Sequence, residues 1–84
     1  MIICFTPTAW EQYVEWQFED KKIAKKINEL IKDITRNPFE GIGKPEQLKH
    51  NLKGFWSRRI TQEHRLVYEI DNEHIYITYC KYHY

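Results

Sequence analysis

The spacing of apolar residues along the chain changes near its middle. Before residue 38, apolar residues recur every three or four positions, which is typical of amphipathic helices. After residue 54, aromatic and β-branched residues alternate with polar ones, which is typical of strands with one buried face. A short apolar run at residues 2–5 precedes the first helix and predicts a strand. The pattern therefore predicts a strand, two helices and then three strands.

Two helices are predicted between residues 8 and 36. The first begins at a capping box, Thr8-Ala9-Trp10-Glu11, and runs to about Phe18. The second spans residues 21–36, because Asp20 can cap its start and the residue before Pro38 is pushed out of the α region. The expected inner faces are Trp10, Tyr13, Val14 and Phe18 in the first helix, with Trp16 undecided, and Ile23, Ile27, Leu30, Ile31 and Ile34 in the second.

Residues 38–53 form the longest stretch without an apolar period. Long loops in compact domains are usually functional or disordered. Within this loop, Pro45 is expected to open a single helical turn that places Glu46, Lys49 and His50 on one side. A carboxylate beside a lysine on a loop is only a weak sign of chemistry.

Three strands are predicted at residues 55–61, 64–70 and 74–82. Alternation places Trp56, Arg58 and Ile60 on one face, which is expected to pack on both helices. The opposite face carries Arg59 and Arg65 and is expected to be open to solvent or substrate. A sheet that served only for stability would be expected to carry Val, Thr or Tyr at most of these positions. The guanidinium group of arginine is suited to bidentate binding of phosphate.

The facing of the last strand is ambiguous, because Ile75 and Ile77 share parity with His83. Either a bulge or burial of both faces would resolve it. The fold expected is α+β: one domain over residues 1–84, with an antiparallel sheet and two helices packed on one of its faces, in the order βααβββ.

The charge is segregated along the chain although its net value is only +1. Residues 1–20 hold four acids and no Lys or Arg, whereas residues 21–60 hold eleven Lys or Arg against four acids. A basic middle suggests a polyanion as partner. The lysine row of the second helix fits two interpretations, a solvated face or a docking surface for an RNA backbone.

Composition narrows the class of protein. With 84 residues, 42% of them hydrophobic and 15% aromatic, the chain suits one modest globular core. Cys4 and Cys80 are expected to be buried thiols in a reducing cytosol, since a disulfide framework would use more cysteines. Residues 1–5 lack the length and basic flank of a signal peptide, and no apolar run approaches membrane-spanning length, so a cytoplasmic protein is expected.

Several segments carry a family resemblance. They include Gly54-Phe55-Trp56-Ser57-Arg58-Arg59-Ile60 and Tyr82-His83-Tyr84, with further matches at residues 25–33, 38–41, 43–46, 48–52 and 63–68. In register and over essentially the whole chain, these segments closely resemble the YoeB toxins of bacterial toxin–antitoxin systems, which belong to the RelE/ParE superfamily.

The resemblance implies a ribosome-dependent messenger-RNA endonuclease with a microbial-RNase-like α+β fold. In that chemistry the ribose 2′-hydroxyl attacks the adjacent phosphodiester, leaving a 2′,3′-cyclic phosphate and a 5′-hydroxyl. By this resemblance, Glu46 matches the general base of the family and His83 matches its general acid. Arg65 matches the residue that stabilises the negative charge of the phosphorane. Its supporting contacts to the substrate match Lys49, Arg59 and Tyr84.

The resemblance also implies partners and the absence of a cofactor. No metal or other cofactor is expected, and the sequence has no His, Cys and Asp cluster at metal-ligand spacing. The expected partners are messenger RNA in the ribosomal A site, the 70S ribosome and a cognate YefM-like antitoxin, with a homodimer allowed and no membrane. The remaining histidines, His50, His64 and His74, are assigned to hydrogen bonding or surface roles, and Trp10 and Tyr79 to the core.

Two other functions stay open. The RelE/ParE superfamily includes ParE-like toxins that cut no RNA and inhibit a protein target such as gyrase. A protein that occupies the ribosome and blocks it without cleavage is the second. ParE-like toxins generally lack the full set of Glu, Lys, Arg and His found here, which disfavours the first alternative.

Overall fold

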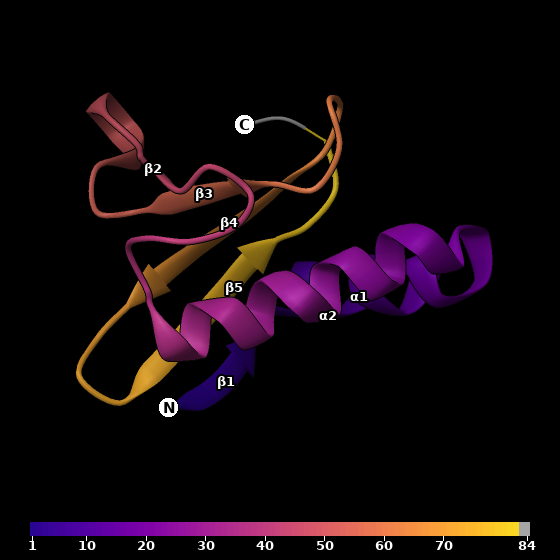
Figure 1. Cartoon of the computed structure of the whole chain (residues 1–84), viewed down its shortest axis with the longest axis horizontal. Helices are drawn as coiled ribbons and strands as arrows, with labels where there is room; N and C mark the ends of the chain where they lie inside the picture. The colour runs from indigo at the N-terminus through magenta and orange to yellow at the C-terminus, as the bar shows by residue number, and fades with distance from the viewer. Residues whose placement is uncertain (83–84) are drawn as a thin grey trace.

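The computed structural model describes residues 1–82 as a five-stranded sheet and two helices. The elements in chain order are β1 (Ile2–Phe5), α1 (Pro7–Glu19), α2 (Lys21–Arg36), β2 (Glu46–Gln47), a 3₁₀ turn (His50–Leu52), β3 (Trp56–Arg59), β4 (Arg65–Ile70) and β5 (His74–Tyr79). Figure 1 shows the two helices running side by side along one flank of the strands. The α+β class predicted from the sequence is confirmed.

The sheet is mixed, whereas a wholly antiparallel sheet was predicted. Its strand order is β1-β5-β4-β3-β2. The pairs β2–β3, β3–β4 and β4–β5 are antiparallel, but β1 lies parallel to β5, with Ile3 opposite Ile75. Both helices and the strands β2 to β4 separate β1 from β5 along the chain. This long connection allows β5 to lie parallel to β1, whereas a short hairpin can join only antiparallel strands.

Helix α2 has the predicted bounds, and α1 begins earlier than predicted. The Asp20 carboxylate accepts hydrogen bonds from the amides of Lys22 and Ile23 and so caps α2. The cap of α1 is Thr6, whose hydroxyl accepts from the Ala9 amide, so the capping box predicted at Thr8 is wrong. Pro7 explains the shift, because proline is favoured at the first helical position, where its missing N–H is not needed.

The buried face of α1 also differs from the prediction. Ala9 and Trp16 are buried, whereas Trp10 is 53% exposed and Phe18 85% exposed. Trp16 is held in place by its indole N–H, which donates to the Cys80 carbonyl at 2.9 Å. Trp10 instead stacks at the surface on Tyr13. The predicted apolar stripe of α1 was therefore wrong at both of its ends.

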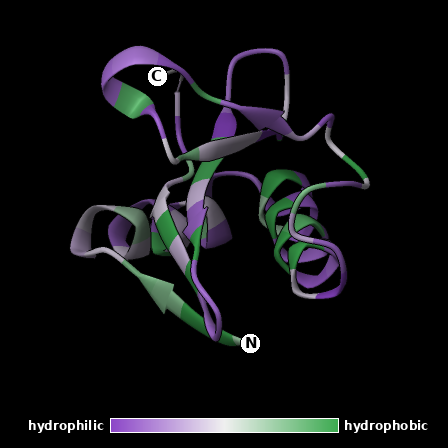
Figure 2. Cartoon of the chain, turned by 90° about the vertical axis from the view of Figure 1, so that its left-hand side faces the viewer, coloured by the Kyte–Doolittle hydropathy of each residue, from purple (hydrophilic) through white to green (hydrophobic). Residues whose placement is uncertain are grey.

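The core lies between the helices and one face of β4 and β5. It joins the predicted α2 stripe to the strands, with Ile23 at its margin: Ala9, Trp16, Ala24, Ile27, Leu30, Ile31, Ile34, Ile60, Leu66, Tyr68, Ile75, Ile77 and Cys80. Figure 2 shows hydrophobic residues along the helices and central strands and mostly hydrophilic loops at the upper end of the view. That end carries the candidate site.

A β-bulge settles the facing of the last strand. Tyr68 pairs with Ile77 but its neighbour Val67 pairs with Tyr79, so Thr78 is an extra residue in β5. Ile75 and Ile77 consequently face the core, while the half-buried Tyr79 lies on the opposite face with Val67. Tyr79 is therefore not a core residue, and β5 ends there rather than at residue 82.

Both cysteines are free thiols. Cys80 is fully buried, and this burial raises the pKa of its thiol to about 12. Cys4 is only half-buried on the edge strand β1, which departs from the prediction of two buried thiols. Neither helix in residues 1–82 is long and apolar enough to cross a bilayer.

Candidate active site

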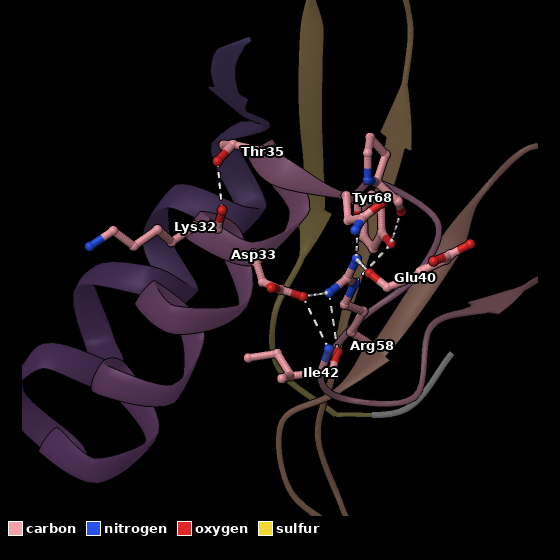
Figure 3. A network of polar contacts seen from close by, with 9 residues as sticks. Lys32, Asp33, Thr35, Glu40, Ile42, Arg58 and Tyr68 are labelled. Atoms are coloured by element: carbon pink, nitrogen blue, oxygen red, sulfur yellow. Dashed lines mark hydrogen bonds and ion pairs between the residues drawn. The ribbon is translucent and has the colours of Figure 1, made fainter.

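A buried arginine holds the loop that leads to the site. Arg58 is fully buried, and its guanidinium makes five hydrogen bonds. Its Nη1 donates to Asp33 Oδ2 at 2.6 Å and its Nε to the Tyr68 hydroxyl at 3.1 Å (Figure 3). The remaining three bonds go to the backbone carbonyls of Asn37, Glu40 and Ile42. All five donors of the guanidinium are thus satisfied, as burial requires.

The partners of Arg58 complete a network around the loop of residues 37–43. The hydrogen bond from Arg58 is the largest of several influences that lower the pKa of Asp33, followed by the Ile42 amide, which donates to the same oxygen at 3.0 Å. The Tyr68 hydroxyl donates to the Pro38 carbonyl at 2.8 Å, and burial raises the pKa of Tyr68. The loop is therefore bound to both α2 and the sheet.

Two glycines allow the loop to pass close to this network. A side chain at Gly41 would collide with the Asp33 carboxylate. At Gly43 the backbone has φ +78°, and a Cβ would lie 2.7 Å from Leu30 Cδ2. The Gly43 carbonyl also accepts from the Arg59 amide at 2.6 Å, which begins the pairing of this segment with β3.

Glu46 lies on an edge strand, not on the helical turn predicted at Pro45. It pairs with Ser57 of β3, and beyond it the Leu48 amide donates to the Phe55 carbonyl at 2.9 Å. The helical turn occurs later, at His50–Leu52, because residues 43–48 satisfy their backbone groups against β3. This pairing places the exposed Glu46 side chain on the face of the sheet turned away from the helices.

Arg59 and Arg65 lie directly opposite each other on β3 and β4, on the face of the sheet turned away from the helices. This face was predicted to be open to solvent, but Ser57 and Val67 on it are buried. Arg59 is exposed and Arg65 half-buried. Nη1 of Arg65 donates to the carbonyls of Thr61, Gln62 and His64 at 2.7 to 3.2 Å. These bonds fix the guanidinium against the β3–β4 turn, with Nε and Nη2 as its further donors.

A cross-strand row relates Glu46 to the arginines. Glu46, Ser57, Val67 and Tyr79 are neighbours across β2, β3, β4 and β5. Arg59 lies two residues beyond Ser57, which makes it the diagonal neighbour of Glu46, at about 7–8 Å between Cα atoms. One carboxylate and two guanidinium groups therefore share a single face, and Arg59 is the nearer of the two arginines to Glu46.

A shallow depression of about 450 Å³ adjoins Glu46 and is lined by residues 46–52. Lys49 and His50 both line it and are exposed. The structure thus places Lys49 in the same depression as Glu46, on the segment that joins β2 to the 3₁₀ turn. The surroundings of Glu46 are cationic, which suits a ligand with several phosphates.

Two predicted site residues, His83 and Tyr84, lie outside the described residues. The structure does place Tyr82, the residue before them: its carbonyl accepts from the Arg65 amide at 3.1 Å. Its amide donates to Nδ1 of His64 at 2.8 Å. The described chain therefore ends beside Arg65 and the β3–β4 turn (Figure 1).

No specific role was predicted for Arg58 or His64. Arg58 was placed on the apolar face with Trp56 and Ile60, and an arginine at a core-facing position is the signal that a buried network is present. His64 was given only a general hydrogen-bonding role. No pattern in the sequence reveals its contact with Tyr82, because 18 residues separate them.

The arrangement supplies a carboxylate as a candidate proton acceptor and fixed cations for a phosphate. Within residues 1–82, no group of three or more His, Cys, Asp and Glu side chains is arranged to hold a metal ion. The expectation of cofactor-free chemistry stays a prediction.

Comparison with known proteins places the chain among bacterial toxins. The model of the YoeB-like toxins of bacterial type II toxin–antitoxin systems matches residues 5–84. Toxin YoeB of Escherichia coli (strain K12) is 60% identical to the chain over 84 residues, which cover 100% of both proteins.

Solved structures agree with this similarity. The YoeB dimer from Staphylococcus aureus superposes with a TM-score of 0.94 at 60% identity, covering 100% of this chain and 98% of that one. The heterotetrameric YoeB–YefM toxin–antitoxin complex from Staphylococcus aureus contains a chain with a TM-score of 0.92 at 60% identity and the same coverage.

Proposed function

This chain belongs to the YoeB-like toxins of bacterial type II toxin–antitoxin systems, and from that membership we propose that it is an endoribonuclease that cleaves messenger RNA in the A site of the 70S ribosome. The observation that carries the proposal is the set of charged residues on the face of the sheet turned away from the helices. There Glu46 is the diagonal neighbour of Arg59, Arg59 faces Arg65, and the chain arrives at Tyr82 beside Arg65.

Cleavage begins at the ribose 2′-hydroxyl. Glu46 removes its proton, and the oxygen attacks the adjacent phosphorus, forming a new P–O bond. The P–O5′ bond breaks, and His83 donates the proton that the departing 5′-oxygen takes up. The products are a 2′,3′-cyclic phosphate and a 5′-hydroxyl, and no oxidant or other co-reactant is consumed.

The cations act on the charge that builds on the phosphorane oxygens. Arg65 stabilises that charge from a position fixed by the β3–β4 turn, so little reorganisation is needed as the charge develops. Arg59 and Lys49 contact the substrate phosphates from β3 and from the depression beside Glu46. Tyr84 orients the RNA by stacking or hydrogen bonding. The chemistry requires no metal.

The test is to map new 5′ ends on messenger RNA bound to programmed ribosomes. Wild-type protein is expected to produce an end inside the A-site codon. The variants Glu46→Gln and His83→Ala should each lower the cleavage rate by about 10²–10⁴-fold. Glu40→Gln is the matched control, because Glu40 lies on the same loop, with an exposed side chain, and only its carbonyl enters the Arg58 network.

The other outcomes identify the alternatives. Translation that stops without new RNA ends would indicate a ribosome-binding inhibitor that does not cleave. Inhibition of gyrase with no effect on ribosomes would indicate a ParE-like toxin. Undiminished ends with His83→Ala would remove His83 from the role of general acid.

We also propose a YefM-like antitoxin as partner, as in the Staphylococcus aureus complex. An acidic segment of such a protein would meet the cations that surround Glu46, an arrangement that favours fast association. A homodimer is proposed by analogy with the Staphylococcus aureus YoeB dimer. Because the proposed site of action is the ribosome, the same proposal puts the protein in the cytoplasm.

A further inference from the structure

The last described residue of the chain is held by both of its backbone groups. The Tyr82 amide donates to His64 Nδ1 at 2.8 Å, and the Tyr82 carbonyl accepts from the Arg65 amide at 3.1 Å. Tyr82 adopts φ +65°, a conformation that non-glycine residues rarely take. Its side chain is 62% exposed, so burial contributes little to fixing this backbone.

The imidazole of His64 is itself fixed from two sides. The Trp16 ring meets it edge-on with the centroids 4.8 Å apart, and the Tyr82 ring lies 5.6 Å away. Trp16 is buried and anchored through its indole N–H to the Cys80 carbonyl. The His64 amide donates to the Thr61 hydroxyl at 3.1 Å, which holds the residue in the β3–β4 turn.

A second anchor acts on the residue before Tyr82. The Lys81 ammonium lies 3.2 Å from Glu19 and 3.5 Å from Glu15, and it stands 4.9 Å from the centroid of the Trp16 ring. Burial works against the charge of Lys81, but the two glutamates outweigh it and raise the pKa of Lys81. At the end of the described chain, Lys81 is thus held by helix α1, and the next residue, Tyr82, is held by the β3–β4 turn.

We propose that His64 is a positioning residue for RNA cleavage: its Nδ1 accepts the Tyr82 amide and thereby sets where the chain enters His83. This inference rests on the proposed function, in which His83 is the general acid. One peptide unit separates Tyr82 from His83, so their Cα atoms are about 3.8 Å apart. A fixed Tyr82 backbone therefore limits the positions open to the acid, and a misplacement of about 1 Å can lower a rate by about 10²-fold.

The chemistry of the contact defines what His64 must provide. Nδ1 accepts a hydrogen bond, so the proton of the neutral ring resides on Nε2. The requirement is an acceptor at the Nδ1 position, not an aromatic ring as such. Two substitutions separate these properties. His64→Phe keeps a ring against Trp16 but has no acceptor, whereas His64→Asn keeps an acceptor near the Nδ1 position but has no ring.

The experiment measures single-turnover cleavage on programmed ribosomes, ribosome binding, and amide hydrogen exchange of Tyr82 in the free protein. His64→Phe is expected to lower the maximal cleavage rate by about 10–10²-fold without weakening ribosome binding. It should also accelerate exchange of the Tyr82 amide. His64→Asn should recover most of both. The matched controls are His74→Phe and His74→Asn, at the far end of the β4–β5 hairpin, which should leave cleavage and Tyr82 exchange unchanged.

The opposite order of the two variants would overturn the inference. If His64 serves only to pack against Trp16, His64→Phe will cleave like the wild type and His64→Asn will be impaired. Equal cleavage by His64→Phe and wild type overturns it in the same way. A wild-type protein that cuts no RNA would instead refute the proposed function, and the exchange of Tyr82 would still decide whether His64 holds the chain end.

Discussion

Arg59 and Arg65 lie directly opposite each other on neighbouring antiparallel strands. Like charges at such a pair destabilise a sheet by about 0.2–1 kcal/mol. The Arg65 guanidinium is turned toward the carbonyls of the β3–β4 turn, which partly offsets the repulsion. A repulsive pair is expected where the sheet binds an anion, because bound phosphate removes the repulsion.

Substitution of Arg59 should therefore stabilise the free protein and impair cleavage. Arg59→Gln is expected to raise the free energy of unfolding by about 0.2–1 kcal/mol, measured with urea. It should also lower the rate of messenger-RNA cleavage. Lys32→Gln removes a similar charge from an exposed position of α2, where the side chain points away from the sheet (Figure 3), and should change neither quantity. An Arg59→Gln protein less stable than wild type would show that the repulsion is already relieved.

The Asp33–Arg58 ion pair should make the free energy of unfolding depend on pH. The hydrogen bond from Arg58 lowers the pKa of Asp33 in the folded protein. A carboxylate with a lower pKa when folded contributes stability that is fully present above its unfolded pKa, about 3.9, and is lost as the pH falls through the folded value. Asp33→Asn should cost about 3–5 kcal/mol at neutral pH, because it leaves a fully buried guanidinium without its counter-charge.

Urea unfolding of wild type and Asp33→Asn at several pH values tests this. The difference between them should be constant above about pH 5 and should shrink below about pH 4. Glu29→Gln, on an exposed position of the same helix, should track the wild type at every pH. If the difference in unfolding free energy between the two proteins does not change with pH, the charge of Asp33 contributes nothing to stability and only the shape of its side chain matters.

Replacement of Gly43 by a larger residue should destabilise the protein in two ways, by straining the backbone and by creating steric clashes. Gly43 and Gly54 both have positive φ, at +78° and +99°, but only at Gly43 would a Cβ meet neighbours, among them Leu30 and the backbone of Arg59. Gly54→Ala is therefore expected to cost about 1–3 kcal/mol from backbone strain alone. Gly43→Ala should cost clearly more and should also lower cleavage, since Glu46 follows three residues later. Equal unfolding free energies for the two variants would exclude the role of the close contacts.

Local signals made α2 fully predictable. Asp20, the apolar period and Asn37-Pro38 all act within one or two helical turns, and the structure gives the predicted bounds. The shared face of Arg59 and Arg65 was likewise predicted from the alternation of side chains along each strand, whereas their direct pairing was not. The start of α1 was also a local matter, but the capping box at Thr8 competed with Thr6-Pro7, and the latter prevails.

The errors lie where distant contacts decide. Trp16 is buried because Cys80, from the other end of the chain, accepts its N–H. Glu46 lies on a strand because Arg58 and Gly43 bring its loop against β3, and neither contact has a signature near residue 46. The parallel pairing of β1 with β5 likewise joins the two ends of the chain. Glu46 and Lys49 were named as site residues from family resemblance, whereas Arg59 and Arg65 were already indicated by the strand pattern. The structure adds that Glu46 shares the face of both arginines and that Lys49 lines the depression beside Glu46.

Removal of the last two residues should separate stability from cleavage. The described contacts at the chain end involve Lys81 and Tyr82, with Glu15, Glu19, His64 and Arg65, and all of them precede residue 83. Deletion of His83 and Tyr84 is therefore expected to change the free energy of unfolding by no more than about 0.5 kcal/mol. Cleavage should fall by about 10²–10⁴-fold, because the proposed general acid is lost.

The double variant His83→Ala/Tyr84→Ala is the matched control, since it keeps the chain length and removes only the side chains. It should be as inactive as the deletion and equally stable. A double variant that is much more active than the deletion would assign the effect to the backbone of residues 83–84 rather than to the acid. A deletion that unfolds at much lower urea than the double variant would show that these two residues support the fold, contrary to the anchoring of the chain end at Tyr82.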